Sequence, residues 1–308
     1  MEANLLRFQS FPAIFTISRT KSQIFAVQIA PPLSKNCNFL AISGIQKNRT
    51  HSVMASASTG FKNASRIDES EMYNLDGIRS SLIRLEDSII FSLVERAQYC
   101  FNKDTYNRDG ILKETEKINA KLGRYKSPYE HPFFPNDLPE SILPPLQYPE
   151  VLHPCANSIN VNKIVSNMYF NELLPGLVKE GDDGNYGSTA TCDAICLQLL
   201  SKRIHYGKFL AEAKFRASQV EYETAIRAQD SKKLEDLLTY TDVENATLER
   251  VKKKAETYAQ VVYEGPSEVE SKPVNKLNPG FVTSVYGECI MPLTKRVIQV
   301  MYLLKRLD

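Results

Sequence analysis

The chain has 308 residues, of which 43% are hydrophobic and 24% are charged, a composition ample for a buried core in one large domain or two ordinary ones. Its formal net charge of +2 is unevenly spread: residues 1–67 hold eight Lys or Arg and a single acid, Glu2, which leaves −5 for the remainder. A slightly acidic body argues against a nucleic-acid surface, which needs clustered positive charge, so we expect no nucleic-acid partner.

The first 65 residues, rich in Arg, Lys and Ser and nearly free of acids, are typical of an organelle transit peptide. Their apolar runs are interrupted by Arg19, Lys21 and the Pro31-Pro32 pair, so none approaches the ~20 apolar residues of a membrane helix. A plastid or mitochondrial address is favoured over a secretory signal, and the alternative is a disordered basic tail. We expect no membrane partner and a folded domain in residues 66–308.

Helical periodicity dominates from residue 70 onward. Apolar residues of the first helix recur at intervals of three and four, at Ile78, Leu82, Leu85, Ile89 and Leu93. Its expected N-cap is Asp76. A second helix is predicted in "GILKETEKINAKLGRY" (110–125), followed by a loop at 128–154, which holds half of the chain's prolines.

Three more helical blocks are predicted at about 158–180, 191–228 and 242–262, and a final helix at about 280–306 carries Pro292 early in its course. The segment "AQVVYEG" (259–265) is the only weak strand candidate. The predicted fold class is therefore all-α, a single helical-bundle domain with long helices.

Two cysteines, Cys192 and Cys196, would share one helical face and could suggest a metal pair. No histidine lies close enough in the sequence to complete a familiar zinc spacing. We therefore expect buried free thiols there, and no metal or other cofactor.

A charged stripe lies within the apolar stretch 199–215. Arg203, Gly207, Leu210 and Lys214 fall on one helical face, with ~16 Å of backbone between the two cations. Gly207 is expected to leave an empty notch between them that suits a small carboxylated ligand. The alternative, which spacing alone favours, is that both cations lie on a solvated face with their stems along apolar neighbours. No nucleophile–base pair or glycine-rich phosphate loop accompanies the stripe, so any chemistry here must depend on positioning and electrostatics.

Several long motifs of the chain resemble the plant and fungal chorismate mutase family. They are "IRSSLIRLEDSIIFSLVERA" (78–97), "RYKSPYEHPFFP" (124–135), "GSTATCD" (187–193), "LSKRIHYGKFLAEAKF" (200–215) and "YLLKRLD" (302–308), in family order over about residues 70–308. The resemblance implies an intramolecular Claisen rearrangement of chorismate to prephenate, for phenylalanine and tyrosine synthesis. The substrate is a dicarboxylate and no covalent intermediate forms, which agrees with the two cations and the absent nucleophile.

By this resemblance, Arg203 and Arg79 each hold one carboxylate, and Lys214 donates to the ether oxygen as its bond breaks. Glu244 matches the acid that receives the ring hydroxyl; without the resemblance it would be a first-turn acid that complements a helix dipole. Fungal members have an asparagine where this chain has Tyr240, so no side-chain role carries over to that position.

In the last helix, the family places a threonine four residues before a Gln or Glu that makes the second ether contact. Here Thr294 precedes Gln299 by five residues. The extra residue rotates one against the other by ~100° on an ideal helix. A single-turn π-bulge would absorb it, and we assign both residues to the site.

The resemblance also implies a homodimer that tyrosine inhibits and tryptophan activates at a site between subunits. Matching positions are Arg124, Asn185, Gly187, Ser188 and Thr191. Gly187 and Ser188 would open a long helix, whose N-terminus attracts a carboxylate, unless Ser188 is only a helix cap. Gly123 replaces an arginine of the fungal pattern, which removes one anion contact.

Because the front extension fits the plastid form of the family, the plastid stroma is the expected location. A mutase that aromatic amino acids do not regulate is one alternative. A related enzyme that eliminates pyruvate from isochorismate is another. A non-catalytic helical binding protein is the third, and the extra residue between Thr294 and Gln299 is the feature that favours it.

Overall fold

The computed structural model describes residues 74–106, 110–144, 148–260 and 276–307, all within one compact unit, 59–308. The transit peptide predicted at 1–65 lies outside the described residues, as does the strand candidate "AQVVYEG" beyond its first two residues. Every secondary-structure element in the described ranges is helical, which confirms the all-α prediction.

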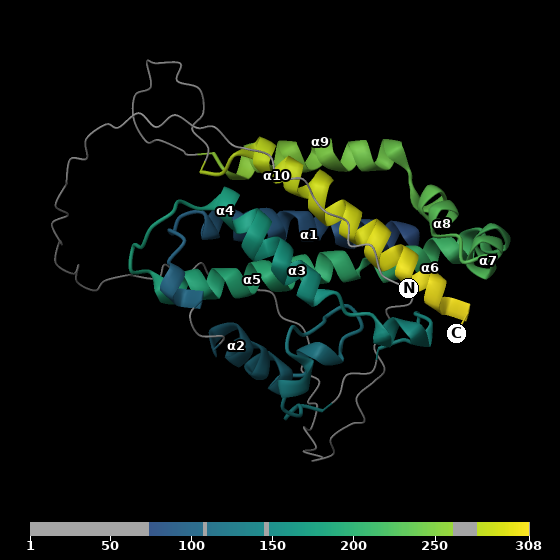
Figure 1. Cartoon of the computed structure of the whole chain (residues 1–308), viewed down its shortest axis with the longest axis horizontal. Coiled ribbons are helices and arrows are strands. Elements are labelled where there is room, and N and C mark those ends of the chain that lie inside the picture. Colours follow the sequence, from purple (N-terminus) through teal and green to yellow (C-terminus); the bar gives the residue numbers. More distant parts are fainter. Residues whose placement is uncertain (1–73, 107–109, 145–147, 261–275, 308) are drawn as a thin grey trace, which may run out of the picture. The chain divides into compact units, whose positions relative to one another are not determined.

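Eleven α-helices are present in those ranges (Figure 1): α1 Leu75–Arg96, α2 Gly110–Lys121, α3 Asn162–Met168, α4 Leu174–Leu177, α5 Tyr186–His205, α6 Gly207–Ala217, α7 Gln219–Arg227, α8 Ser231–Leu238, α9 Thr241–Tyr258, α10 Pro279–Val285 and α11 Val300–Leu304. Three π-helical segments interrupt them, at Tyr169–Leu173, Tyr286–Ile290 and Leu293–Gln299. Between α2 and α3 the described residues of the predicted loop contain only short 3₁₀ turns, as the prolines require. No helix in the part of the chain that the structure describes is long and apolar enough to cross a membrane.

Helix α1 buries the apolar face that its periodicity predicts: Ile78, Leu82, Leu85, Ile89 and Leu93 are all buried. Its cap differs from the prediction. The N-cap is Asn74, whose side chain accepts a hydrogen bond from the Gly77 amide at 2.7 Å. Asp76 lies in the first turn instead, where its charge complements the helix dipole.

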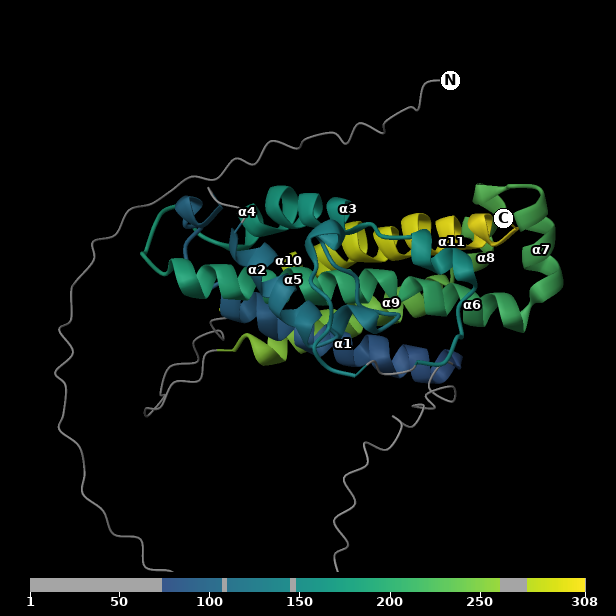
Figure 2. The same cartoon turned by 90° about the horizontal axis from the view of Figure 1, so that it is seen from below.

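The long helices lie side by side. Helix α1 packs on α5 and on α9, and the last helical run, from α10 to α11, crosses α9, α5 and α6 (Figures 1 and 2). Residues from all of these helices form the main hydrophobic core. In this arrangement the N-terminal part of α1 and the C-terminal helical run both pack near the junction between α5 and α6.

The helical block predicted at 191–228 begins earlier than predicted and divides into three. Asn185 is the N-cap residue of α5. Tyr206 separates α5 from α6 with helical dihedral angles, φ −59° and ψ −17°, so the axis continues almost unbroken, and Ser218, at φ −141°, separates α6 from α7. Arg203 and Lys214 therefore remain on one helical run.

Candidate active site

A cavity of about 430 Å³ lies among α1, α5, α6, α9 and the last helical run, a size suited to a small ligand. All six residues predicted to be catalytic line it, although they come from four separate helical runs of the chain: Arg79, Arg203, Lys214, Glu244, Thr294 and Gln299. The structure thus brings together residues that the sequence connects only through the family resemblance.

Arg203 enters the cavity from the end of α5, and only 6% of it is exposed. Its Nη1 donates to Thr294 Oγ1 at 3.3 Å, while its Nε is buried and has no hydrogen-bond partner among the described residues. Burial lowers the pKa of its guanidinium, since water is removed from the charge. A buried cation with donors that lack partners destabilises the fold unless an anion binds to those donors.

Lys214, from α6, is the second buried cation. It is 8% exposed, its Nζ donates to the Leu238 carbonyl at 2.7 Å, and the ammonium lies 4.3 Å from the ring centre of Tyr240. Burial lowers the pKa of Lys214 to about 8, while the charge of Glu244 opposes that shift. The alternative of two cations on a solvated face is therefore wrong, because both Arg203 and Lys214 are buried.

The predicted notch at Gly207 is also wrong, because the last helical run fills that space. A Cβ at Gly207 would lie 2.9 Å from the Thr294 carbonyl oxygen and 3.1 Å from Ile298 Cγ2. Glycine permits this close approach of two helical backbones. The ligand space lies beside this contact, between the side chains of Arg203 and Lys214.

Thr294 and Gln299 lie on the π-helical segment Leu293–Gln299, so the extra residue is absorbed in the way that their spacing left open. The wider turn restores their common face, and both side chains line the cavity. Thr294 is 4% exposed and its hydroxyl donates to the Ile290 carbonyl at 2.7 Å. Gln299 is 3% exposed and its Oε1 is buried without a hydrogen-bond partner.

Arg79 and Glu244 lie at the more open side of the cavity. The Arg79 side chain is 46% exposed and 3.5 Å from Asp76. Glu244, in the first turn of α9, is 2.8 Å from Lys295 Nζ and its side chain is 32% exposed. Its first-turn position fits the dipole interpretation as well, since one carboxylate can complement the helix and face the cavity.

Sequence reasoning missed several polar residues that line the same cavity, namely Glu86, Tyr240, Asp242, Arg250 and Lys295. Glu86 is 1% exposed and accepts two hydrogen bonds of 2.8 Å from the Arg250 guanidinium. The sequence did carry a signal for Glu86, because it follows Leu85 on the buried face of α1, where an acid requires a partner.

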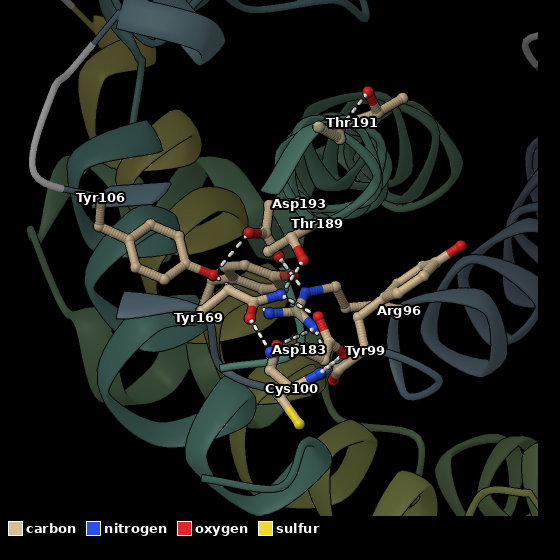
Figure 3. Close-up of polar contacts among 11 residues, drawn as sticks. Arg96, Tyr99, Cys100, Tyr106, Tyr169, Asp183, Thr189, Thr191 and Asp193 are labelled. Atoms are coloured by element: carbon tan, nitrogen blue, oxygen red, sulfur yellow. Dashed lines mark hydrogen bonds and ion pairs between the residues drawn. The ribbon is translucent and has the colours of Figure 1, made fainter. Parts of the chain in front are cut away.

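The residues predicted to bind an effector lie mostly at the start of α5. Asn185, Gly187, Ser188 and Thr191 are exposed there, and the Thr191 hydroxyl donates to the Gly187 carbonyl at 2.9 Å (Figure 3). Ser188 is not the N-cap, so its role as a cap is excluded. The backbone N–H groups of this first turn are available to a carboxylate.

The fifth effector residue, Arg124, is held elsewhere. Its Nε donates to Glu130 at 3.2 Å, and Glu130 also accepts from Lys202 Nζ at 3.1 Å, near the far end of α5. No described contact joins Arg124 to the start of that helix. The preceding Gly123 adopts φ +82°, a left-handed conformation that favours glycine over the arginine of the fungal pattern.

A buried polar cluster supports the start of α5 (Figure 3). Its centre is Arg96, the last residue of α1, which is 0% exposed and donates from Nε to Asp193 at 2.7 Å. Asp193 also accepts from the hydroxyl groups of Tyr106, at 2.7 Å, and Tyr169, at 2.6 Å. Next to it, Cys192 and Cys196 are free thiols, as expected, and burial raises the pKa of both.

Comparison with known proteins agrees with this geometry. The family model described as chorismate mutase type II matches residues 185–299, which span α5 to Gln299. Chorismate mutase 1, chloroplastic, of Petunia hybrida is 54% identical over 327 residues and covers 100% of both chains. The chain belongs to the chorismate mutase family. It is therefore an isomerase, and the resemblance stated from its motifs is confirmed.

Solved chorismate mutase structures share the fold of this mutase. The crystal structure of AtCM1 with tyrosine bound in the allosteric site is 60% identical with a TM-score of 0.70, covering 78% of this chain and 99% of that one. Aro7p chorismate mutase from Candida albicans, in complex with L-Trp, is 36% identical with a TM-score of 0.71, covering 77% of this chain and 93% of that one.

Proposed function

We propose that the 430 Å³ cavity binds chorismate and holds it in the conformation that rearranges to prephenate. The observation that carries this proposal is the pair of buried cations, Arg203 and Lys214, with the unused donor of Arg203 inside a cavity that suits a small dicarboxylate. Arg203 and Arg79 each take one carboxylate. The guanidinium group suits this role because it binds a carboxylate through two parallel hydrogen bonds.

Lys214 and Gln299 act on the ether oxygen of the substrate. As the C–O bond breaks and the new C–C bond forms, negative charge grows on that oxygen, and donors already in place stabilise it without reorganisation. Such a donor is typically worth ~3–4 kcal/mol of barrier. Thr294 fixes the direction of Arg203 through its 3.3 Å hydrogen bond.

Glu244 accepts the ring hydroxyl of the substrate. Its 2.8 Å contact with Lys295 keeps the carboxylate in place. No proton has to leave the protein in this scheme, and no covalent bond forms between enzyme and substrate.

The test is the loss of chorismate absorbance with the purified full chain and with residues 66–308, the range in which we expect the domain. Both should produce prephenate, and Arg203→Ala should lower kcat/KM by about 10³-fold while the circular dichroism stays that of the parent. Retained turnover in Arg203→Ala would refute the two-cation clamp. A folded wild-type chain that makes no prephenate would support the non-catalytic binding protein instead.

We further propose that an aromatic amino acid binds at the start of α5 and regulates the mutase, with tyrosine as inhibitor and tryptophan as activator. The exposed first turn, with Gly187, Ser188 and Thr191, offers hydrogen-bond donors to its carboxylate. Since Arg124 is held near Lys202 in the same chain, the site would take its arginine from a second subunit of a homodimer. Analytical ultracentrifugation tests the dimer, and rates of chorismate loss with added tyrosine or tryptophan test the regulation. A monomer whose rate changes with neither amino acid would contradict the proposal.

The location we propose is the plastid stroma, with residues 1–65 as a transit peptide that is removed on import. Relatives named chloroplastic and the basic composition of this segment support the proposal. Import into isolated chloroplasts, followed by sequencing of the mature N-terminus, tests it. A chain that remains outside the organelle at full length would overturn it.

A further inference from the structure

The turn between α8 and α9, residues Leu238, Thr239 and Tyr240, meets both lysines of the cavity. The Leu238 carbonyl accepts from Lys214 Nζ at 2.7 Å, and Thr239 Oγ1 accepts from Lys295 Nζ at 3.0 Å. The Tyr240 ring covers the Lys214 ammonium at 4.3 Å. This turn therefore fixes two cations of the cavity.

Tyr240 is unusual for an aromatic residue, because it is 48% exposed and yet lines the cavity. Its main chain is not helical, with φ −123° and ψ 88°, and it is the N-cap residue of α9. Its carbonyl accepts the first helical hydrogen bond, from the Glu244 amide, at 3.0 Å. One residue thus contacts Lys214 with its ring and Glu244 with its backbone.

The way in which Lys214 is held matters for its proposed role. Within the described residues, no carboxylate forms an ion pair with it; one carbonyl and one ring face hold it instead. An ammonium group has three N–H donors, so two remain for a ligand in the cavity. A ring face attracts the cation without accepting a conventional hydrogen bond, so it orients the group and leaves those donors unused.

We propose that Tyr240 is a positioning residue, whose ring face holds the ammonium of Lys214 toward the substrate's ether oxygen and whose aromatic character, rather than its hydroxyl, performs this task. The proposal deepens the function proposed above and rests on the role given there to Lys214. It is specific to this chain's own residue at a position where no side-chain role is implied by the family.

The charges around Lys214 give the effect a direction. Arg79 on α1 and Lys295 on the last helical run disfavour its charged form, and Glu244 on α9 favours it. Arg203 on α5 and Asp242 on α9 line the same cavity. The Tyr240 ring, like Glu244, favours the charged form of Lys214. A cation–π contact of this type raises the pKa of a lysine by roughly half a unit to one and a half units.

The decisive experiment varies only the electron density of the ring. Tyr240→Phe keeps the ring face, and phenylalanines with one or three ring fluorines at position 240 weaken it progressively at almost constant size. Log kcat should fall steadily with fluorination, while Tyr240→Phe stays within about twofold of the parent. Tyr240→Leu should lower kcat by about 2- to 30-fold, with a smaller change in KM.

A second readout is independent of turnover. The pKa of Lys214, followed by NMR of a selectively labelled side chain, should move to lower pH in Tyr240→Leu and stay in place in Tyr240→Phe. Phe91→Leu is the matched control, because Phe91 is 54% exposed and stacks on Tyr258 outside the cavity. That variant should keep both kcat and the pKa of Lys214.

The outcomes distinguish the positioning role of Tyr240 from the role proposed for Lys214. A flat fluorination series, or equal losses in Tyr240→Phe and Tyr240→Leu, overturns the positioning role. Full activity in Lys214→Met overturns the role of Lys214 itself, and the positioning role falls with it. If Lys214→Met is inactive and the NMR pKa follows the ring, both proposals stand.

Discussion

The cavity and the polar cluster at the start of α5 each contain a buried arginine, Arg203 on α5 and Arg96 at the end of α1. The two guanidinium groups differ in how many of their donors have a hydrogen-bond partner. Arg96 donates to Asp193, to the Tyr106 hydroxyl and to the carbonyls of Tyr99 and Cys100. Within the part of the chain that the structure describes, Arg203 makes one hydrogen bond of 3.3 Å, and its Nε has no partner.

The difference shows how to distinguish a structural polar group from a binding group. A buried charged group whose nitrogens all have hydrogen-bond partners stabilises one arrangement of the chain. A buried donor without a partner lowers the free energy of unfolding by about 1–3 kcal/mol. Arg96 is therefore expected to contribute to folding, and Arg203 to ligand binding at some expense to folding.

The largest effect should come from Arg203→Ala. We expect kcat/KM to fall by about 10³-fold, because a donor to developing or fixed negative charge is lost from a site that excludes water. The free energy of unfolding should stay the same or rise, since an unsatisfied buried charge disappears. Initial rates of chorismate loss and urea denaturation measure both; a large loss of stability would remove the contrast with Arg96.

Arg96→Met should give the converse result. We expect the free energy of unfolding to fall by about 3–5 kcal/mol, because Asp193 keeps its burial but loses its cation. The remaining folded protein should keep its kcat/KM within a few fold. Asp193→Asn, alone and combined with Arg96→Met, completes a double-mutant cycle. If the losses in the free energy of unfolding of the two single variants add up to that of the double variant, the two residues are not coupled.

Gly207→Ala tests the close contact that replaced the predicted notch. The new Cβ would lie 2.9 Å from the Thr294 carbonyl oxygen, so the last helical run must shift. Overpacking of this kind costs about 1–3 kcal/mol, and kcat should fall as well because Gln299 follows on the same segment. Gly110→Ala is the control, since among the described residues outside its own helix and chain neighbours no atom lies within 4 Å of a Cβ placed there. Equal effects of the two substitutions on unfolding would contradict the contact.

The smallest effect concerns pH. Lys214 must be protonated to present a positive charge to the ether oxygen, because the neutral amine keeps N–H donors but loses the charge. Burial lowers its pKa to about 8, so kcat/KM should fall about tenfold for each pH unit above that value. Lys208 also has a pKa lowered to about 8 by burial, but it bonds the carbonyls of Ala156 and Ile159. Lys208→Met should keep the midpoint, and Lys214→Arg should remove the alkaline fall.

The periodic parts of the molecule were predictable from local patterns. The buried face of α1, the proline-rich loop and the all-helical class follow from spacing and composition, because they depend on neighbours in the sequence. The N-cap of α1 was predicted two residues too late, since Asn74 and Asp76 are both good caps and only the main-chain angles select one.

The extra residue between Thr294 and Gln299 could also be interpreted in advance. Counting residues against the family spacing required either a lost contact or a π-bulge, and the structure has the π segment. Here the sequence reduced the outcomes to two, because helix geometry permits few ways to absorb one residue, and the structure chose between them.

The sequence by itself determined the all-helical class, the family and six of the residues that line the cavity. Only the tertiary structure decided that Arg203 and Lys214 are buried, that Gly207 lies against the last helical run rather than beside a ligand, and that Glu86, Tyr240 and Lys295 share the cavity. Periodicity assigns a residue to a face of a helix. Burial, charge pairing and close approach depend on which other helix covers that face, and that partner can be distant in the chain.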